Sequence, residues 1–153
     1  MAVPSFAPPH TVYAGPFWDG VAANELRLPR CTGCGAFQWY PLAGVDHCAG
    51  ATLEWTPVRA VGTIFTFTVV RRPFLPGSSK ADVPITSVLV ELDDAPSVRL
   101  VGRLTDGFDA KIGMRVTGEF FDNDGRRDVQ FTPLGAGERS SQLNGGSDGR
   151  RDG

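Results

Sequence analysis

The segment Cys31-Thr32-Gly33-Cys34-Gly35 has the form of a zinc knuckle, and the third and last cysteine of the chain follows at Cys48. Two thiolates three residues apart can bind one metal ion, and a small residue after the second lets the backbone turn around the sulfur atoms. A zinc ribbon needs a second Cys-x-x-Cys pair, but Val45 stands where that pair would begin. The spacing therefore predicts a structural zinc site with three thiolates and a fourth ligand of another type.

Asp46 and His47 are the two candidates for the fourth ligand. Asp46 is favoured, because adjacent residues such as His47 and Cys48 point in opposing directions, whereas Asp46 and Cys48 can converge. The alternative is a decayed site, in which Val45 marks the loss and the remaining cysteines are small buried residues without a metal. A catalytic zinc is disfavoured, because the H-x-E and P-C-x-x-C signature of zinc deaminases is not in the sequence.

Composition and charge exclude several classes of protein. The 153 residues carry a net charge of −2 and are 41% hydrophobic, which fits one ordinary domain or two small modules. The arginines are scattered, so a nucleic-acid partner is not expected. Three cysteines favour metal ligation in a reducing compartment over disulfides. The chain starts without a signal-peptide pattern and has no long apolar run, which predicts a cytoplasmic protein that does not enter a membrane.

The segment before the knuckle is expected to form an arm and a helix. Residues 1–15 contain three prolines and no periodicity, which indicates an extended arm. Pro16 suits a first helical turn, and apolar spacing predicts a helix to about Leu28, with Pro29 ending it. Phe17 and Trp18 in this helix are expected to be core or interface anchors. Within the knuckle, Phe37, Trp39 and Tyr40 are expected to form a short aromatic strand.

From residue 52 onward, strand patterns without long helices favour a small antiparallel barrel or sandwich. The clearest strand is 62–72, in which Phe65, Phe67 and Val69 share the face assigned to the core; the alternative is that the two phenylalanines are exposed and stack bases. Asp124-Gly125 predicts a hairpin turn. The other strands are expected at residues 52–60, 83–93, 97–104, 114–121 and 128–132, with strand glycines Gly62, Gly102 and Gly118 at barrel bends.

The sequence offers no set of residues for independent catalysis. Its two histidines, His10 and His47, lie outside the strand region, so no Ser-His-Asp or Cys-His arrangement can be assembled there. Neither a G-x-G-x-x-G pattern nor a P-loop is present. Asp93-Asp94, before a proline, is better explained as a solvated turn than as an acid–base pair. The long proline-rich loop 73–84 is instead a candidate contact surface.

The order of these segments resembles the DUF35 family, which joins a rubredoxin-like zinc ribbon to an OB-fold and is associated with acyl-CoA metabolism. The resemblance covers residues 13–134 and is carried by Phe17-Trp18, residues 28–35, Tyr40-Pro41, Leu53-Glu54-Trp55, and residues 62–70, 88–93, 112–116 and 129–133. It implies a mainly β chain with an N-terminal arm and helix (1–29), a zinc-ribbon hairpin (30–51) and a five-stranded OB-fold barrel (52–134). Residues 135–153 lie beyond the resemblance, and their many glycines and few apolar side chains predict a disordered tail. The family pattern usually has four cysteines, and Val45 departs from it.

The same resemblance implies a non-catalytic accessory subunit. Family members support thiolase-superfamily enzymes, including thiolases and the thiolase-like aldolases of steroid side-chain degradation, and the partner carries the catalytic residues. A heterotetramer with two copies of each chain is then expected, with a structural zinc ion in the ribbon. The alternatives are a partner of a MaoC-type enoyl-CoA hydratase and a nucleic-acid-binding module. The expected partner contacts are Phe17, Trp18, Trp39, Tyr40, Phe74 and Leu75. Arg71 and Arg72 are the first candidates to contact CoA phosphates, and Arg99 and Arg103 are the alternatives.

Overall fold

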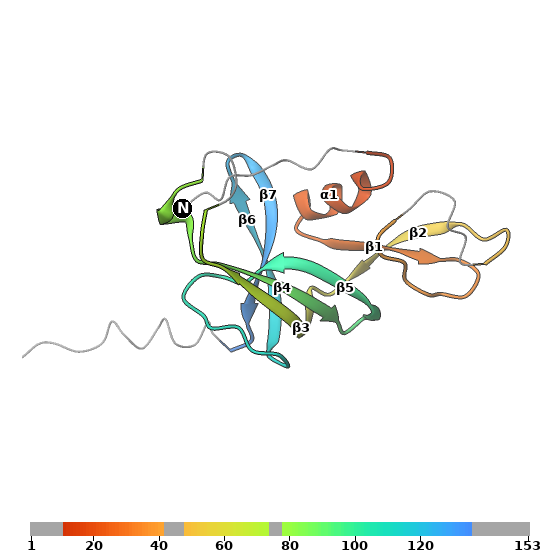
Figure 1. The fold of residues 1–153 in the computed structure, drawn as a ribbon. Coiled ribbons are helices and arrows are strands. Elements are labelled where there is room, and N and C mark those ends of the chain that lie inside the picture. The colour runs from red at the N-terminus through yellow and green to blue at the C-terminus, as the bar shows by residue number, and fades with distance from the viewer. Residues whose placement is uncertain (1–10, 42–47, 74–77, 136–153) are drawn as a thin grey trace, which may run out of the picture.

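The computed structural model describes residues 11–41, 48–73 and 78–135, and this part of the chain is mainly β (Figure 1). A two-stranded ribbon projects to the right of Figure 1, and five further strands form a curled sheet at its centre. This arrangement confirms the predicted fold class. The elements are α1 (Gly15–Ala22), β1 (Leu26–Cys31), β2 (Leu53–Val58), β3 (Val61–Val70), the short 3₁₀ helix η1 (Lys80–Asp82), β4 (Ile85–Leu92), β5 (Ala95–Arg103), β6 (Arg115–Asn123) and β7 (Arg126–Pro133).

The five-stranded sheet closes on itself to form an OB-fold barrel. Its strand order is β5-β4-β3-β6-β7, and all neighbouring strands are antiparallel. The two edge strands, β5 and β7, meet and close the barrel. Leu104, directly after β5, forms a parallel bridge with Phe131 of β7, and the Thr105 amide donates to the Phe131 carbonyl at 2.8 Å. Closure in this way leaves little unpaired strand edge, as expected for a small barrel.

Phe131 fills the centre of the barrel because Gly102 leaves room for its ring. Phe131 is fully buried, and a Cβ atom at Gly102 would lie 2.6 Å from two carbons of that ring. Smaller branched side chains, such as Ile64 and Val116, occupy the rest of the interior. The strand glycine therefore permits close approach of the aromatic ring, which is one of the roles of glycine within strands.

The predicted turn at Asp124-Gly125 is confirmed. Both residues have positive φ angles, 52° and 78°, as the two central residues of a type I′ hairpin turn require. The turn joins β6 to β7, whose pairing ends at Asn123 and Arg126.

The helix prediction was too long at its C-terminal end. α1 ends at Ala22, Asn24 adopts a φ of 58°, and the chain reverses before Leu26. Leu26 and Leu28 then lie in β1, where they are buried and pair with Val58 and Thr56 of β2. Pairing with a strand distant in sequence outweighs the local helical spacing, because it buries both leucines while satisfying their backbone groups.

The assignment of Phe65 and Phe67 to the core was also wrong. Their side chains are 46% and 37% exposed, whereas the neighbouring Ile64 is fully buried. The β3–β4 register shifts between Ile64 and Thr66, so a bulge interrupts the alternation at Phe65. A single-residue change in register exchanges the two faces of a strand, which periodicity alone cannot reveal.

Other predictions for the ribbon and the connecting segments were met only in part. The aromatic strand expected within the knuckle consists of one isolated bridge, between Arg30 and Phe37. The centre of the loop 73–84, most of the N-terminal arm and the tail after residue 135 lie outside the described residues. No helix in the described segments is long and apolar enough to cross a membrane.

Candidate functional site

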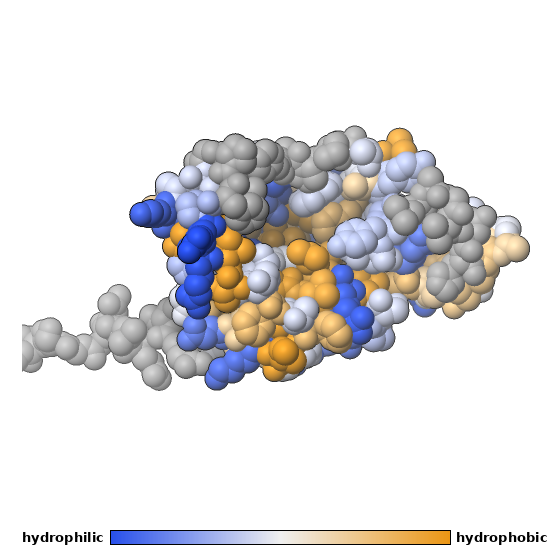
Figure 2. All heavy atoms as spheres, in the orientation of Figure 1, coloured by the Kyte–Doolittle hydropathy of each residue, from blue (hydrophilic) through white to orange (hydrophobic). Residues whose placement is uncertain are grey.

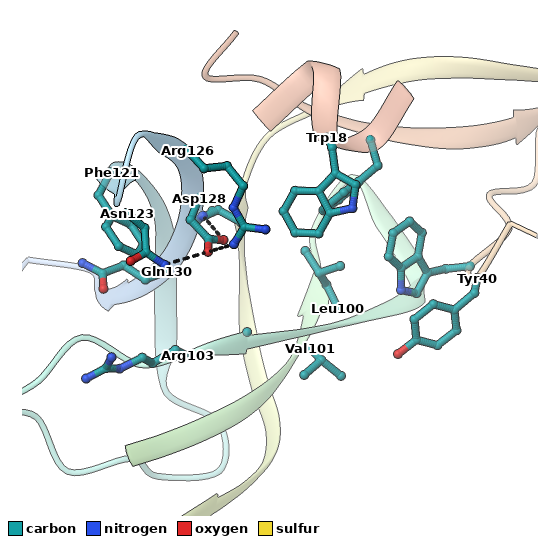
Figure 3. A pocket seen from close by; sticks show the side chains of 14 residues that line it. Trp18, Tyr40, Leu100, Val101, Arg103, Phe121, Asn123, Arg126, Asp128 and Gln130 are labelled. Atoms are coloured by element: carbon teal, nitrogen blue, oxygen red, sulfur yellow. Dashed lines mark hydrogen bonds and ion pairs between the residues drawn. The ribbon is translucent and has the colours of Figure 1, made fainter. Parts of the chain in front are cut away.

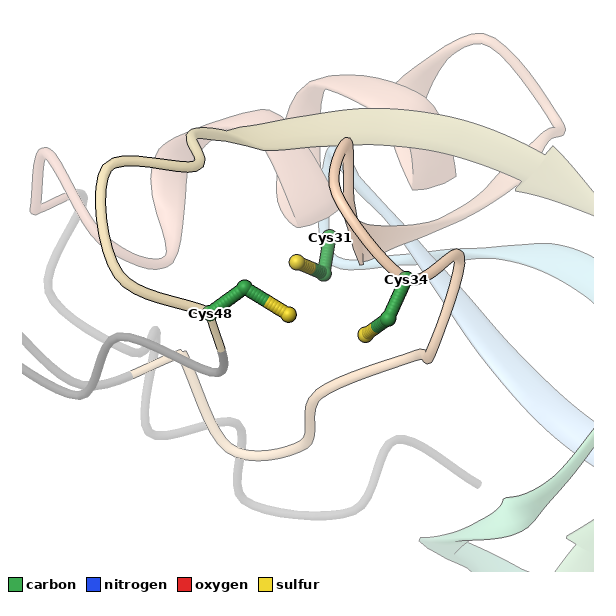
Figure 4. A group of neighbouring side chains, drawn as sticks. All are labelled: Cys31, Cys34 and Cys48. Carbon is green, nitrogen blue, oxygen red and sulfur yellow. The ribbon is translucent and has the colours of Figure 1, made fainter.

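Three cysteines meet at the tip of the ribbon. Cys31 is buried at the end of β1, Cys34 is exposed, Cys48 is half-buried, and their Sγ atoms all lie within 4.8 Å of one another. Figure 4 shows the three sulfur atoms directed toward a common centre. Zinc–sulfur bonds of about 2.3 Å place tetrahedral thiolates roughly 3.8 Å apart, so a small inward movement would complete three coordination bonds.

Local backbone geometry positions the first two cysteines. The Cys31 amide donates to the Ala36 carbonyl at 2.8 Å, and the Gly35 amide donates to the Cys31 carbonyl at 2.8 Å. Gly35 has a φ of 73°, a left-handed conformation that glycine adopts without strain. Gly33 permits a second close approach, because a Cβ atom there would lie 3.2 Å from the Cys48 Cβ atom. The glycines on either side of Cys34 thus bring the three thiols together.

The thiols are electrostatically suited to a cation. Backbone amides of Cys34 and Gly33 donate to the Cys31 sulfur and lower the pKa of that thiol. Side-chain hydrogen bonds with the Cys34 and Cys31 thiols are the main cause that raises the pKa of Cys48 to about 11, and burial and repulsion between thiolates in one cluster add to it. A divalent cation would remove this penalty, and sulfur is a preferred zinc ligand. The donor set therefore fits zinc. Asp46 and His47 lie outside the described residues, so the identity of the fourth ligand stays a prediction.

The predicted aromatic contacts converge in space. Phe17 of α1 is buried and lies with its ring centre 5.1 Å from those of Trp18 and Trp39. Trp39 in turn stacks on Tyr40 at 5.2 Å. Together they line one side of a cavity of about 490 Å³, whose other side is formed by residues of β5, β6 and β7 (Figure 3). Phe74 and Leu75, the other two predicted contacts, lie outside the described residues.

The arginines proposed to contact CoA phosphates lie elsewhere. Arg71 and Arg72 follow the end of β3 and are exposed, and neither forms an ion pair within the described ranges. Arg71 lines a groove together with Phe67 and Phe108. Both guanidinium groups are therefore accessible to an anion, and both residues are distant in sequence from the three cysteines.

Two family models match this chain in adjoining segments. The model described as the ChsH2 rubredoxin-like zinc ribbon domain matches residues 18–54, and that described as the ChsH2 C-terminal OB-fold domain matches residues 55–121. Together they span more than half of the chain. It belongs to the DUF35 family of ChsH2-type proteins. The zinc-ribbon model covers all three clustered cysteines, so this DUF35 chain carries a zinc ribbon whose site lacks one of the usual four thiolates.

Individual relatives agree with the family assignment. The 3-oxo-4,17-pregnadiene-20-carboxyl-CoA hydratase alpha subunit of Mycobacterium tuberculosis is 34% identical over 108 residues, which cover 69% of this chain and 33% of that protein. This DUF35 chain thus spans about a third of the length of that relative.

Two solved structures have the same fold. A structure described as the Ltp2-ChsH2(DUF35) aldolase superposes with a TM-score of 0.71 at 22% identity, covering 82% of this chain and 98% of the other. A DUF35 protein of unknown function from Sulfolobus solfataricus superposes with a TM-score of 0.55 at 14% identity, covering 80% and 85%.

The cavity includes residues that sequence reasoning did not identify. Arg126 places its guanidinium carbon 5.2 Å from the centre of the Trp18 ring and donates to Asp128 at 2.8 Å. Leu100 of β5 lines the same cavity. In sequence these residues are about a hundred positions from Trp18, and a basic residue beside a hairpin turn is ordinary. No local signal distinguishes them, because only the docking of α1 on β7 brings them together.

Proposed function

We propose that this chain is a non-catalytic accessory subunit that binds and supports a thiolase-superfamily acyl-CoA enzyme, either a thiolase-like aldolase or lyase, or a thiolase. The observation that carries the proposal is the pairing of a ChsH2-type ribbon and barrel in one chain, with the fold of the Ltp2-ChsH2(DUF35) aldolase structure over 98% of that chain. The described residues include no histidine, and their one cluster of three potential metal ligands is the cysteine site. The catalytic groups are expected on the partner.

Exposed apolar side chains support a role in assembly. Figure 2 shows apolar residues gathered over the barrel strands on the side facing the viewer. Phe65 and Phe67 lie on β3, and Val101 on β5 is 58% exposed. Tyr40, at the mouth of the aromatic cavity, is 57% exposed. Patches of this kind on a small chain are typical of protein interfaces. We assign Trp18, Trp39 and Tyr40 to the contact with the partner enzyme, together with Phe74 and Leu75 of the loop 73–84.

The proposal is tested by co-expression with the thiolase-like protein encoded next to this chain. We expect the two chains to co-purify as a heterotetramer with two copies of each, a mass that native mass spectrometry would resolve. Without this chain, the partner should have little activity toward its CoA thioester, and adding this chain should restore the activity of the complex. The proposal fails if the partner does not co-purify and is fully active alone.

A second candidate is a subunit of a MaoC-type enoyl-CoA hydratase. The observation that favours it is the description of the M. tuberculosis relative as a hydratase alpha subunit. This chain matches only a third of that relative, so the matched part need not carry the hydratase chemistry. Co-expression with an adjacent MaoC-type protein, measured by the same co-purification and by hydration of an enoyl-CoA, separates the two candidates.

Direct contact with CoA is a finer point of the proposal. We assign Arg71 and Arg72 to the CoA phosphates, because both are exposed and bidentate arginine–phosphate pairs are strong. Calorimetric titration of CoA into the complex and into the isolated chain tests the assignment. In the complex, replacing both arginines with methionine should weaken CoA binding, while the matched replacement of Arg99 should leave it unchanged.

A further inference from the structure

The cavity between α1, the ribbon and the barrel contains hydrogen-bond donors that the chain does not satisfy. In the described segments, five buried side-chain atoms have no hydrogen-bond partner: Gln38 Oε1, Trp39 Nε1, Arg103 Nε, Arg126 Nε and Arg126 Nη1. The four nitrogen atoms belong to residues that line this one cavity. Buried polar groups normally have partners, so donors gathered at one cavity indicate a ligand that supplies acceptors.

Arg126 is held in place with part of its guanidinium unused. Its Nη2 atom donates to Asp128 at 2.8 Å, and its guanidinium carbon lies 5.2 Å from the centre of the Trp18 ring. Asp128 is itself held by the Val129 amide, which donates to its other oxygen at 2.9 Å. Figure 3 shows the guanidinium of Arg126 between Asp128 and Trp18, at the edge of the cavity. The ion pair fixes the side chain and leaves Nε and Nη1 without an acceptor. Both nitrogens are covered by neighbouring side chains, so a ligand reaches them when those side chains move aside.

The guanidinium groups of the lining favour an anion over a neutral ligand. Its ionisable groups, apart from the phenol of Tyr40, are Arg103, Arg126 and Asp128. Each arginine is paired with an aspartate, Arg126 with Asp128 and Arg103 with Asp106, so the unpaired N–H donors and not a net charge attract the anion. Arg103 already donates through Nη2 to Asp106, which lies outside the lining, and this contact leaves its buried Nε unpaired. Hydrogen bonds from guanidinium groups to an anion are stronger than those to a neutral acceptor.

The rest of the lining is apolar and aromatic. Trp39 and Tyr40 stack with an interplanar angle of 30°, and Leu100 and Val101 lie across from Tyr40 in Figure 3. Tyr40 and Val101 are more than half exposed, so they mark the open side. The volume of about 490 Å³ falls within the range of small-molecule sites. A ligand of this size would place a hydrocarbon body between these walls and its anionic end at Arg126.

We propose that this cavity binds a small apolar carboxylate. The carboxylate accepts hydrogen bonds from the free guanidinium nitrogens of Arg126 and from the indole Nε1 of Trp39. The hydrocarbon body lies against Tyr40, Leu100 and Val101. This site is distinct from the cysteine cluster and from Arg71 and Arg72, and it does not depend on the proposed subunit role, because every group in it belongs to this chain.

The three tryptophans provide a direct readout. Trp18 and Trp39 line the cavity, whereas Trp55 of β2 does not. In ¹⁵N-labelled, zinc-loaded full-length chain, the three indole N–H signals are followed during titration with 2-naphthoate, and in parallel with the neutral 2-naphthamide. We expect naphthoate to move the Trp39 signal most and leave the Trp55 signal in place, and to bind about tenfold more tightly than the amide, as charge-assisted hydrogen bonds predict.

A pair of matched double variants separates the site from general surface charge. Arg126→Met with Asp128→Asn removes the donors without leaving an unpaired carboxylate. Arg99→Met with Glu91→Gln removes another arginine–carboxylate pair, joined at 3.4 Å, outside the cavity. The first should reduce naphthoate affinity about tenfold, through loss of charged hydrogen bonds, and reduce naphthamide affinity by a smaller factor, because its carbonyl accepts only neutral-type hydrogen bonds. The second should leave both affinities at the wild-type values.

The inference is overturned if naphthoate moves no indole signal at millimolar concentration, or if it moves Trp55 as much as Trp39. Equal affinities of the wild type for naphthoate and naphthamide would also overturn it, and this comparison needs no variant to fold. Trp39→Phe retains an aromatic ring and removes the indole N–H, so it should lower naphthoate affinity several-fold. Unchanged affinity in both Trp39→Phe and the Arg126 double variant would contradict the assigned contacts.

Discussion

The ribbon and the barrel are stabilised by different means. Each strand of the barrel buries apolar side chains, and Phe131 lies at the centre of this core. β2 of the ribbon buries no residue fully, and the ribbon tip is organised by Cys31, Cys34 and Cys48. The tip of a short hairpin buries too little surface to be stable alone, so a metal would be the main source of stability at the tip, whereas a five-stranded barrel needs none.

The two regions also share a boundary that is neither metal-dependent nor purely apolar. β1 contributes Leu26 and Leu28 to the common core. Arg59, between β2 and β3, donates its backbone amide and its side chain to Asp94, in the turn between β4 and β5. A metal-dependent tip thus continues into a base that is part of the barrel core. The contrast leads to four predictions.

The largest effect is expected from Cys34→Ser. Because Cys34 is exposed, this nearly isosteric change removes a ligand without disturbing packing. Apparent zinc affinities of small sites amount to about 10–16 kcal/mol, so losing one of only three thiolates should reduce the zinc content below about half an equivalent. Elemental analysis of freshly purified protein measures the metal, and amide NMR spectra should show the ribbon tip disordered and the barrel unchanged.

Thr56→Ala, in β2 of the ribbon, is the matched control for the cysteine variant and should retain zinc. A full equivalent of zinc in Cys34→Ser would contradict the metal assignment, as would less than half an equivalent in the wild-type protein. Loss of the barrel signals together with those of the ribbon would show that the two regions do not differ in their source of stability.

Phe131→Ala is expected to have the next largest effect. Removal of a fully buried phenylalanine from the centre of the barrel should lower the free energy of unfolding by about 3–5 kcal/mol. Urea unfolding followed by circular dichroism measures the loss. Val129→Ala, on the same strand and only partly buried, should cost less. If Phe131→Ala leaves the unfolding midpoint unchanged, the barrel core is not the main source of stability.

Tyr40→Ala tests whether the partner contacts the ribbon side or the barrel alone. An exposed aromatic residue at the centre of an interface commonly contributes about 1–2 kcal/mol or more, so affinity for the proposed thiolase-like partner should fall about tenfold or more. Surface plasmon resonance with the immobilised partner measures the affinity. Ile112→Ala, a highly exposed apolar residue on a barrel loop, is the control and should bind as the wild type does. The reverse result would place the contact on the barrel.

The smallest effect concerns the boundary. Arg59 lowers the pKa of Asp94 to about 2, through hydrogen bonds from its side chain and backbone. Since the ordinary value is about 3.9, this pair contributes stability above pH 4 that is lost as the pH falls toward 2. The stability difference between the wild type and Asp94→Asn should therefore shrink over that interval.

Thermal unfolding of both proteins at several pH values measures this dependence. The change is expected to be small, because the pair is largely solvated. Asp124→Asn, in the β6–β7 turn, should keep the wild-type dependence on pH, since asparagine also tolerates a positive φ angle. If the stability difference between the wild type and Asp94→Asn stays constant from pH 5 to pH 2, the Arg59–Asp94 pair does not make a pH-dependent contribution to stability.

Most strands could be predicted because their signals are local. The strand expected at residues 97–104 largely coincides with β5, and its alternating apolar residues Val98, Leu100 and Leu104 are all buried. Asp124-Gly125 predicted its turn because few residue pairs adopt two positive φ angles without strain. The helix end and the face of β3 were mispredicted because pairing between distant segments determined them: β1 with β2, and β3 with β4 across a bulge.

By itself, the sequence determined the three-cysteine site, the strand segments and the family, because thiolate spacing, alternation and turn residues act over a few neighbouring positions. Only the tertiary structure decided that Phe65 and Phe67 are exposed and that Arg126 lies against Trp18 with unused donors. These features depend on strand register and on the docking of α1 against β7. Both are determined by burial over the whole chain, and no short segment encodes them.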